Sequence, residues 1–156
     1  MNEFELYLKE GKAKRQTPDF ELAASLINDS KARIEKIKKL ELKEFSKIIF
    51  ENAYDAIRDI LDALLAADGY KSYSHEASIA YLEKYAFEDS TLQELDDFRY
   101  QRNSSKYYGK DVSEEDASDI MGFYQKYSEK IISIAKERIH VQKNGQMSRK
   151  MDKEEK

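Results

Sequence analysis

Apolar residues recur every three or four positions along most of the chain, which is the spacing of helices that bury one face. The pattern is clearest from about Glu41 to Ala67, where a second set of apolar residues widens the stripe. The first set is Leu42, Phe45, Ile49, Ala53, Ala56, Ile60 and Leu64, and the second is Ile48, Ile57, Leu61 and Leu65. So wide a stripe predicts a long helix at the centre of a bundle. It ends at Asp68-Gly69, since glycine can adopt the left-handed conformation that terminates helices.

Start and stop signals predict the other helices. Thr17 and Pro18 suit the N-cap and first position of a helix over 18–40, and Ser74 suits the N-cap of a helix over 75–85. A further helix runs from about 90 to 107 or 108 and ends at Gly109, and Ser113 caps the last one. We therefore expect an all-α fold, an antiparallel up-and-down bundle of about five helices.

The two ends of the chain differ from this middle part. Residues 1–16 predict a short amphipathic helix followed by a basic stretch, and residues 17–141 form the bundle. Residues 142–156 have no apolar period and are rich in Lys and Glu, which is typical of a disordered charged tail.

Composition narrows the function classes. The net charge of -4 argues against a protein that coats nucleic acid nonspecifically, although a local basic strip can still contact a few phosphates. There is no Cys and the two histidines are far apart in sequence, so we expect no disulfide, no metal site and no cofactor. No apolar run reaches about 18 residues, and we expect a cytoplasmic protein with no membrane association.

The segment 96–109 is unusual because it places cations, an amide and tyrosines where a core helix would need aliphatic residues. On a helix, Arg99, Arg102 and Lys106 share one face. The neighbouring face holds Asp96, Tyr100, Asn103 and Tyr107. Such a surface suits a phosphate or a partner's carboxylates, and the alternative is a solvated face with salt bridges.

Other polar residues are candidates for supporting roles. Glu51 and Asp55, on the central helix, could orient Arg102 across the bundle, and Arg58 could bridge to a facing carboxylate or lie on a solvated face. His75 is a candidate for proton chemistry if it reaches Arg102; otherwise it is an ordinary residue at a helix start.

Two stretches resemble HEPN domains. Residues 51–77 are similar to the second helix and following loop of those domains, with an alanine-rich helix, Gly69 and then Ser74-His75. Arg102-Asn103 matches the start of the family's Arg-x4-His motif, in which a polar residue follows the Arg, but Tyr107 stands where the His would fall. The resemblance covers about residues 17–140.

The resemblance implies a function at a homodimer cleft. It implies binding of RNA or a nucleotide, with Arg102 on phosphate and contacts from Arg99, Asn103, Lys106 and Tyr108. It also suggests a metal-independent endoribonuclease with Arg102 and Tyr107 as catalytic residues. A tyrosine with a reference pKa near 10 is a poor general base at pH 7, which leaves catalysis open.

Two alternatives remain open. HEPN proteins are also non-catalytic partners of nucleotidyltransferases in toxin-antitoxin-like pairs, where Tyr107 or Tyr108 would be the nearest hydroxyl to modify. The chain could instead be a purely structural bundle in which Asp96 or Asp97 pairs with Arg99 or Arg102 to lock a dimer. No interaction with DNA is expected.

Overall fold

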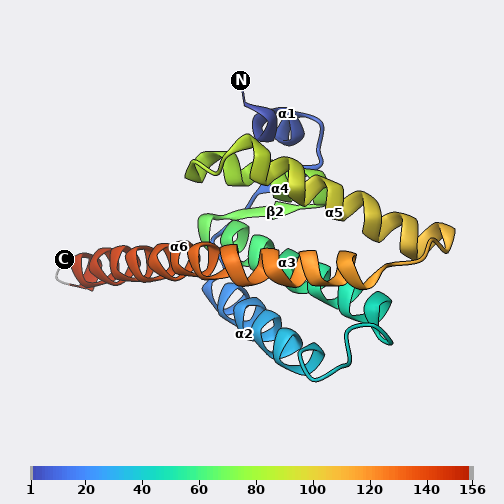
Figure 1. Cartoon of the computed structure of the whole chain (residues 1–156). Helices are drawn as coiled ribbons and strands as arrows, with labels where there is room; N and C mark the ends of the chain where they lie inside the picture. Colours follow the sequence, from blue (N-terminus) through green and yellow to red (C-terminus); the bar gives the residue numbers. More distant parts are fainter. Residues whose placement is uncertain (1, 155–156) are drawn as a thin grey trace.

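The computed structural model describes residues 2–154, and the helix α3 (Ser46–Asp68) lies at its centre (Figure 1). This helix buries side chains on nearly all sides, as its wide apolar stripe predicts. It packs against α2 (Phe20–Ile37), α4 (His75–Ala80), α5 (Asp89–Tyr108) and α6 (Glu114–Glu154). The expected all-α helical bundle is confirmed.

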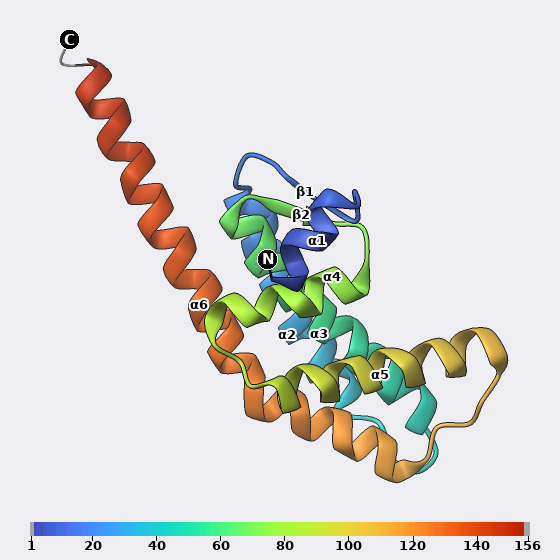
Figure 2. The same cartoon turned by 90° about the horizontal axis from the view of Figure 1, so that it is seen from above.

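The remaining elements are short. The helix α1 (Glu3–Lys9) lies against α4, and a 3-10 turn, η1 (Tyr81–Tyr85), continues α4 toward α5. Figure 2 shows α5 running beside the first half of α6. The described residues thus contain six α-helices, none of which combines the length and apolar character that a membrane span requires.

Side-chain caps define most helix starts. Ser74 Oγ accepts a hydrogen bond from Ala77 N at 3.4 Å, and Ser113 Oγ accepts one from Asp116 N at 3.0 Å, as predicted. The cap of α2 is Asp19 rather than Thr17, since Asp19 Oδ1 accepts from Leu22 N at 3.0 Å. A carboxylate at this position also favours the helix dipole.

The start of the central helix differs from the prediction. Residues 42–45 form turns, and α3 begins at Ser46. Ile48 is 48% exposed, whereas Phe50, outside the predicted stripe, is fully buried between α3 and its neighbours. The predicted helix start is about one turn too early, because Leu42 and Phe45 continue the apolar pattern but pack on the core from the turn that precedes α3.

A two-stranded antiparallel sheet joins the N-terminal segment to the bundle. The strand β1 (Ala13–Arg15) pairs with β2 (Tyr70–Ser72), and the ring of Phe4 packs on Tyr70 and Tyr81 at centroid distances of 5.3 and 4.8 Å. Residues 1–16 were predicted as a separate segment without strands. Strands of three residues show no alternation that a sequence pattern could detect.

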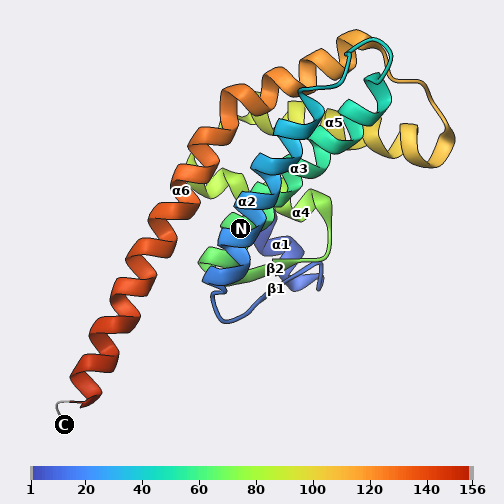
Figure 3. The ribbon, with the colours of Figure 1, turned by 90° about the horizontal axis from the view of Figure 1, so that it is seen from below.

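The C-terminal segment, predicted to be a disordered tail, is helical in the structure. In the structure α6 continues through Glu154, and Figure 3 shows its C-terminal half extending away from the bundle. Residues 155 and 156 of that prediction lie outside the described residues. The segment lacks an apolar period, but a helix that already exists propagates readily through residues such as Lys, Gln, Met and Arg.

Gly69 makes the tight turn from α3 into β2. Its φ is +88°, and a Cβ built there would lie 2.8 Å from the carbonyl oxygen of Gln16. The Gln16 N–H donates to the Gly69 carbonyl at 2.9 Å, so the two chain segments are in direct backbone contact. Only glycine fits both the conformation and the contact.

We expect Gly69→Ala to destabilise the fold by more than about 1 to 2 kcal/mol, the cost of a left-handed alanine, because the close contact adds to that cost. The matched control is Gly122→Ala in α6, where a Cβ meets nothing within 4 Å. That substitution should stabilise the protein by about 0.5 to 1 kcal/mol, since alanine favours helices. Urea unfolding of both variants measures the difference, and equal effects would contradict this account.

Candidate functional site

The buried side chain of Arg102 reaches from α5 to α3. It is only 9% exposed, and its Nη2 donates to Asp55 Oδ1 at 3.0 Å. Its guanidinium carbon also lies 5.7 Å from the ring centroid of Tyr54, the residue before Asp55 on α3. The contact between Asp55 and Arg102 was one of the expected arrangements. An arginine held by a carboxylate and an aromatic ring has little freedom to change its direction.

His75 joins this group through Tyr54. It is the first residue of α4, and its Nδ1 is 3.1 Å from the hydroxyl of Tyr54. The two rings are nearly parallel, with centroids 6.0 Å apart. Tyr54 therefore contacts both Arg102 and His75, which are 27 positions apart in the sequence.

Two further arginines complete the group. Arg99, one turn before Arg102, donates from Nε to Asp96 Oδ1 at 2.7 Å and has its Nη1 3.5 Å from Glu76 Oε1. Arg58 lies on α3, one turn after Tyr54, and is half-buried. We name the set the Arg102 centre, and it consists of Tyr54, Asp55, Arg58, His75, Arg99 and Arg102.

Arg58 and Arg102 carry N–H groups without an acceptor. The Nε atoms of both are buried and have no hydrogen-bond partner among the described residues. Within the same residues, Arg58 forms no close ion pair, unlike Arg99 and Arg102, although its positive charge lowers the pKa of Asp62, four positions later on α3. A buried donor without an acceptor costs about 1 to 3 kcal/mol, and an anionic ligand is one group that removes this cost.

The protonation states of the centre follow from burial and from the arginines. Burial, and then the positive charges of Arg58, Arg102 and Arg99, lower the pKa of His75 to about 4. Burial raises the pKa of Tyr54 to about 12, against the opposite effect of the arginines. At neutral pH the centre thus presents an uncharged imidazole and a protonated phenol beside three guanidinium groups. Guanidinium groups are the side chains that phosphates favour, and the uncharged imidazole can accept a proton, although its lowered pKa makes it a weaker base than a free histidine.

Other predicted site residues lie elsewhere. Glu51 accepts a hydrogen bond from Ser105 Oγ at 3.1 Å, and among the described residues it forms none with Arg102. Tyr107 is 66% exposed and its ring contacts Lys106 Nζ, at 5.7 Å. Five residues turn a helix by about 140° beyond a full turn, which places Tyr107 and Arg102 on different faces of α5.

The exposed end of α5 holds the remaining predicted residues. Asn103 is half-buried, Lys106 is exposed and Tyr108 is 80% exposed. No hydrogen bond or ion pair between described residues links any of them to Arg102. The structure thus brings Arg102 together with Asp55 and His75 rather than with Tyr107.

Sequence reasoning missed Tyr54. This tyrosine stands inside the apolar stripe of the central helix, where an aromatic residue is normally part of the core. The only signal for a polar role was its position next to Asp55, already a candidate partner of Arg102. Within the described residues, no cluster of three or more His, Asp or Glu side chains could hold a metal ion.

No protein-family model matches the chain, and neither does any curated protein. The resemblance to HEPN domains therefore stays a prediction that depends on the motif residues. The geometry and charge of the Arg102 centre are the features of the molecule that indicate a ligand.

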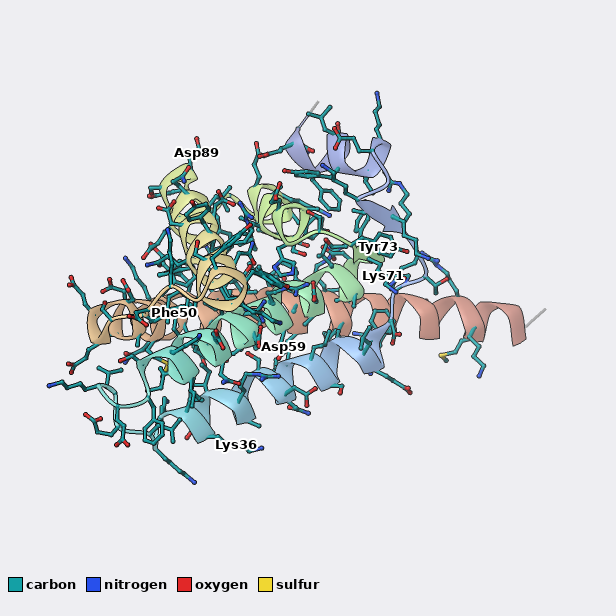
Figure 4. All side chains as sticks on the ribbon, turned by 90° about the vertical axis from the view of Figure 1, so that its right-hand side faces the viewer. Lys36, Phe50, Asp59, Lys71, Tyr73 and Asp89 are labelled. Atoms are coloured by element: carbon teal, nitrogen blue, oxygen red, sulfur yellow. The ribbon has the colours of Figure 1, made fainter. Side chains whose placement is uncertain are left out.

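A second buried group lies on the face of α3 that meets α2, where Figure 4 labels Asp59. Asp59 Oδ2 is 3.8 Å from Arg33 Nε, and burial raises the pKa of Asp59 to about 6 although Arg33 opposes the shift. Its effect on stability is opposite to that of His75. Folded Asp59 retains its proton at pH values where the unfolded chain loses it, so its contribution to stability is lost as pH rises from about 4 to 6.

We expect His75→Gln and Asp59→Asn to change the pH dependence of stability in opposite directions. His75 is neutral when folded, with a pKa of about 4 instead of 6.5, so its contribution is lost as pH falls through that range. In wild type, His75 makes stability rise with pH between 4 and 6.5, and Asp59 makes it fall. Without the His75 effect, His75→Gln should lose stability relative to wild type as pH rises over this range. Asp59→Asn should gain stability over the same range. Thermal unfolding at several pH values measures this, and profiles parallel to wild type would contradict the assignment.

Proposed function

We propose that the chain is a HEPN-like protein that binds RNA or a nucleotide through a phosphate group at the Arg102 centre. One observation carries the proposal: three arginines surround a neutral Tyr54–His75 pair, and Arg58 has no ion pair among the described residues. The arrangement favours an anion whose charge replaces the missing partner.

The chemistry of guanidinium groups specifies the kind of anion. Arginine presents its N–H donors in a planar fork that matches the oxygens of a phosphate. Arg102 is oriented by Asp55, and Arg99 by Asp96, at 3.0 and 2.7 Å. These carboxylates reduce the charge of two arginines, whereas Arg58 forms no close ion pair and has only the longer-range interaction with Asp62. Residues held in this way lose little entropy when a ligand binds.

A homodimer is part of the proposal. Tyr100 and Tyr107 are seven positions apart on α5, so they share one exposed face, and Tyr108 adds to it. Exposed aromatic residues at this density are common where a second chain covers the surface. The centre would then lie beside the interface between two copies.

We expect Arg58→Gln to weaken binding of a short labelled RNA about tenfold or more, since hydrogen bonds to charged groups contribute about 1.5 to 3 kcal/mol. The matched control is Arg33→Gln, which removes a half-buried arginine of α2 that faces α3. Fluorescence anisotropy measures affinity, and light scattering measures the dimer. Equal affinities for wild type and Arg58→Gln would exclude this centre as the phosphate site.

Metal-independent RNA cleavage is a second candidate, favoured by the contact of Tyr54 with both His75 and Arg102. In this reaction the ribose 2′-oxygen attacks its own phosphorus while His75 accepts the hydroxyl proton. The bond from phosphorus to the 5′-oxygen breaks, and that oxygen takes a proton from water. Arg102 and Arg58 stabilise the charge on the phosphate. The products are a 2′,3′-cyclic phosphate and a 5′-hydroxyl.

If the protein cleaves RNA in EDTA, we expect His75→Gln to abolish cleavage and Tyr107→Phe to leave it intact. The reason is that His75 belongs to the Arg102 centre, whereas Tyr107 is exposed on another face of α5. Mass spectrometry of the products identifies the cyclic phosphate. Loss of cleavage in Tyr107→Phe alone would instead assign catalysis to the motif tyrosine.

The alternative role, a non-catalytic partner of a nucleotidyltransferase, stays a prediction. The hydroxyls of Tyr107 and Tyr108 are on side chains exposed enough for another enzyme to reach. Nucleotide transfer to either one would add a mass that peptide mapping locates. It would not depend on Arg58 or His75.

A further inference from the structure

The two-stranded sheet carries a local excess of positive charge. Residues 11–18 and 69–75 contain four Lys or Arg residues and no Asp or Glu, in a chain whose net charge is -4. We name as the ribbon surface the basic and aromatic residues of these two segments. They are Lys12, Lys14, Arg15, Tyr70, Lys71 and Tyr73.

The register of the sheet opposes two like charges. Lys14 of β1 is directly paired with Lys71 of β2, and both side chains are exposed. Neither lysine has an ion pair among the described residues. Like charges directly opposite each other destabilise a sheet, and this sheet has only three residue pairs with which to offset the cost. An anion bound between the two ammonium groups would remove the repulsion.

Tyrosines alternate with these cations. Lys71 Nζ lies 5.5 Å from the ring centroid of Tyr73, and Figure 4 shows both residues at β2 and the segment after it. Arg15 Nη1 donates to the Tyr70 hydroxyl at 2.9 Å, with the guanidinium 5.4 Å from the ring centroid. Tyr73 is 58% exposed although it is large and aromatic. Proteins that bind single-stranded nucleic acids contact the phosphates with cations and stack the bases on exposed aromatic rings.

Protection of the sheet edges against unwanted pairing explains the lysines of the ribbon surface but not its tyrosines. Lysines on edge strands prevent unwanted pairing with other sheets, and both strands here are edges. That role does not require an exposed Tyr73 beside Lys71, nor cations on both strands at the same position. A binding surface accounts for the lysines and the tyrosine together.

We propose that the ribbon surface binds single-stranded RNA, with phosphates at Lys14 and Lys71 and a base stacked on Tyr73. The proposal rests on the proposed function for its ligand class and extends the path of the RNA beyond the Arg102 centre. Tyr73 precedes His75 by two positions, so their backbones are within about 7 Å of each other. One strand of RNA can therefore contact both regions.

The test compares two pairs of lysines in the full chain, with labelled oligo(U) as the probe. Lys14→Ala/Lys71→Ala should weaken binding about tenfold and reduce the slope of log affinity against log salt by about 1.4, the value for two lost contacts to a single strand. The same variant should unfold at an equal or higher temperature, because the like-charge pair is gone. The matched control, Lys136→Ala/Lys143→Ala, removes two exposed lysines of α6 and should bind like wild type.

Tyr73 supplies an independent readout. Tyr73→Ala should weaken binding by about fivefold to a hundredfold, the usual range for one stacked base, and Tyr73→Phe should retain affinity because its ring can still stack. Duplex RNA should bind more weakly than oligo(U). A preference for oligo(dT), or displacement of oligo(U) by a polyglutamate peptide in wild type and Tyr73→Ala alike, would overturn the proposal.

The two variants distinguish the ribbon surface from the Arg102 centre as the site of binding. If Lys14→Ala/Lys71→Ala binds like wild type while Arg58→Gln loses affinity, the ribbon surface is excluded and the Arg102 centre stands. If the lysine variant loses affinity and Arg58→Gln does not, the ribbon surface stands and the phosphate site of the proposed function is excluded. No binding of oligo(U) by wild type overturns both.

Discussion

The central helix α3 is covered on almost every side, so each polar group on it must find a partner inside the protein. Asp68 shows how fully this is achieved. Its carboxylate is almost completely buried, accepts hydrogen bonds from the hydroxyls of Tyr81 and Tyr85, and accepts another from Arg138 Nε at 2.8 Å. One carboxylate thereby ties the end of α3 to η1 and to α6.

The same requirement distinguishes the Arg102 centre from an ordinary buried ion pair. Arg33 of α2 and Asp59 of α3 face each other and have unpartnered atoms, but those atoms are 3.8 Å apart and attract electrostatically. Arg58 forms no ion pair among the described residues, and the carboxylate on which its charge acts is Asp62, four positions later on α3, whose pKa it lowers against the effect of burial. A half-buried guanidinium with an unpartnered N–H and no ion pair costs stability, and an anion that accepts from it would offset this cost. This contrast makes Arg58 the strongest single argument for an anionic ligand.

Sequence patterns predicted the helices well and the site only in part. The stripe of α3, the glycines at positions 69 and 109 and the caps at Ser74 and Ser113 are local features, so the sequence alone reveals them. The contact of Asp55 with Arg102 could be named because two candidates of opposite charge lay on neighbouring helices. The link from Arg102 through Tyr54 to His75 depends on how α5, α3 and α4 pack together, and residue spacing along the chain does not reveal this packing. The sheet was missed for a similar reason, since its register joins residues 55 to 59 positions apart.

An acidic chain can bind RNA only where its positive charges are concentrated, and the turn at Gly69 concentrates them. The turn reverses the chain at the end of α3, so β2 pairs with the basic strand β1. Five residues after the turn, Ser74 caps α4 and sets His75 against Tyr54. The ribbon surface and the Arg102 centre thus share one short segment, residues 69–75, whose direction is fixed by a glycine that no other residue can replace. This common origin is the physical reason why the two regions are proposed as parts of one binding path.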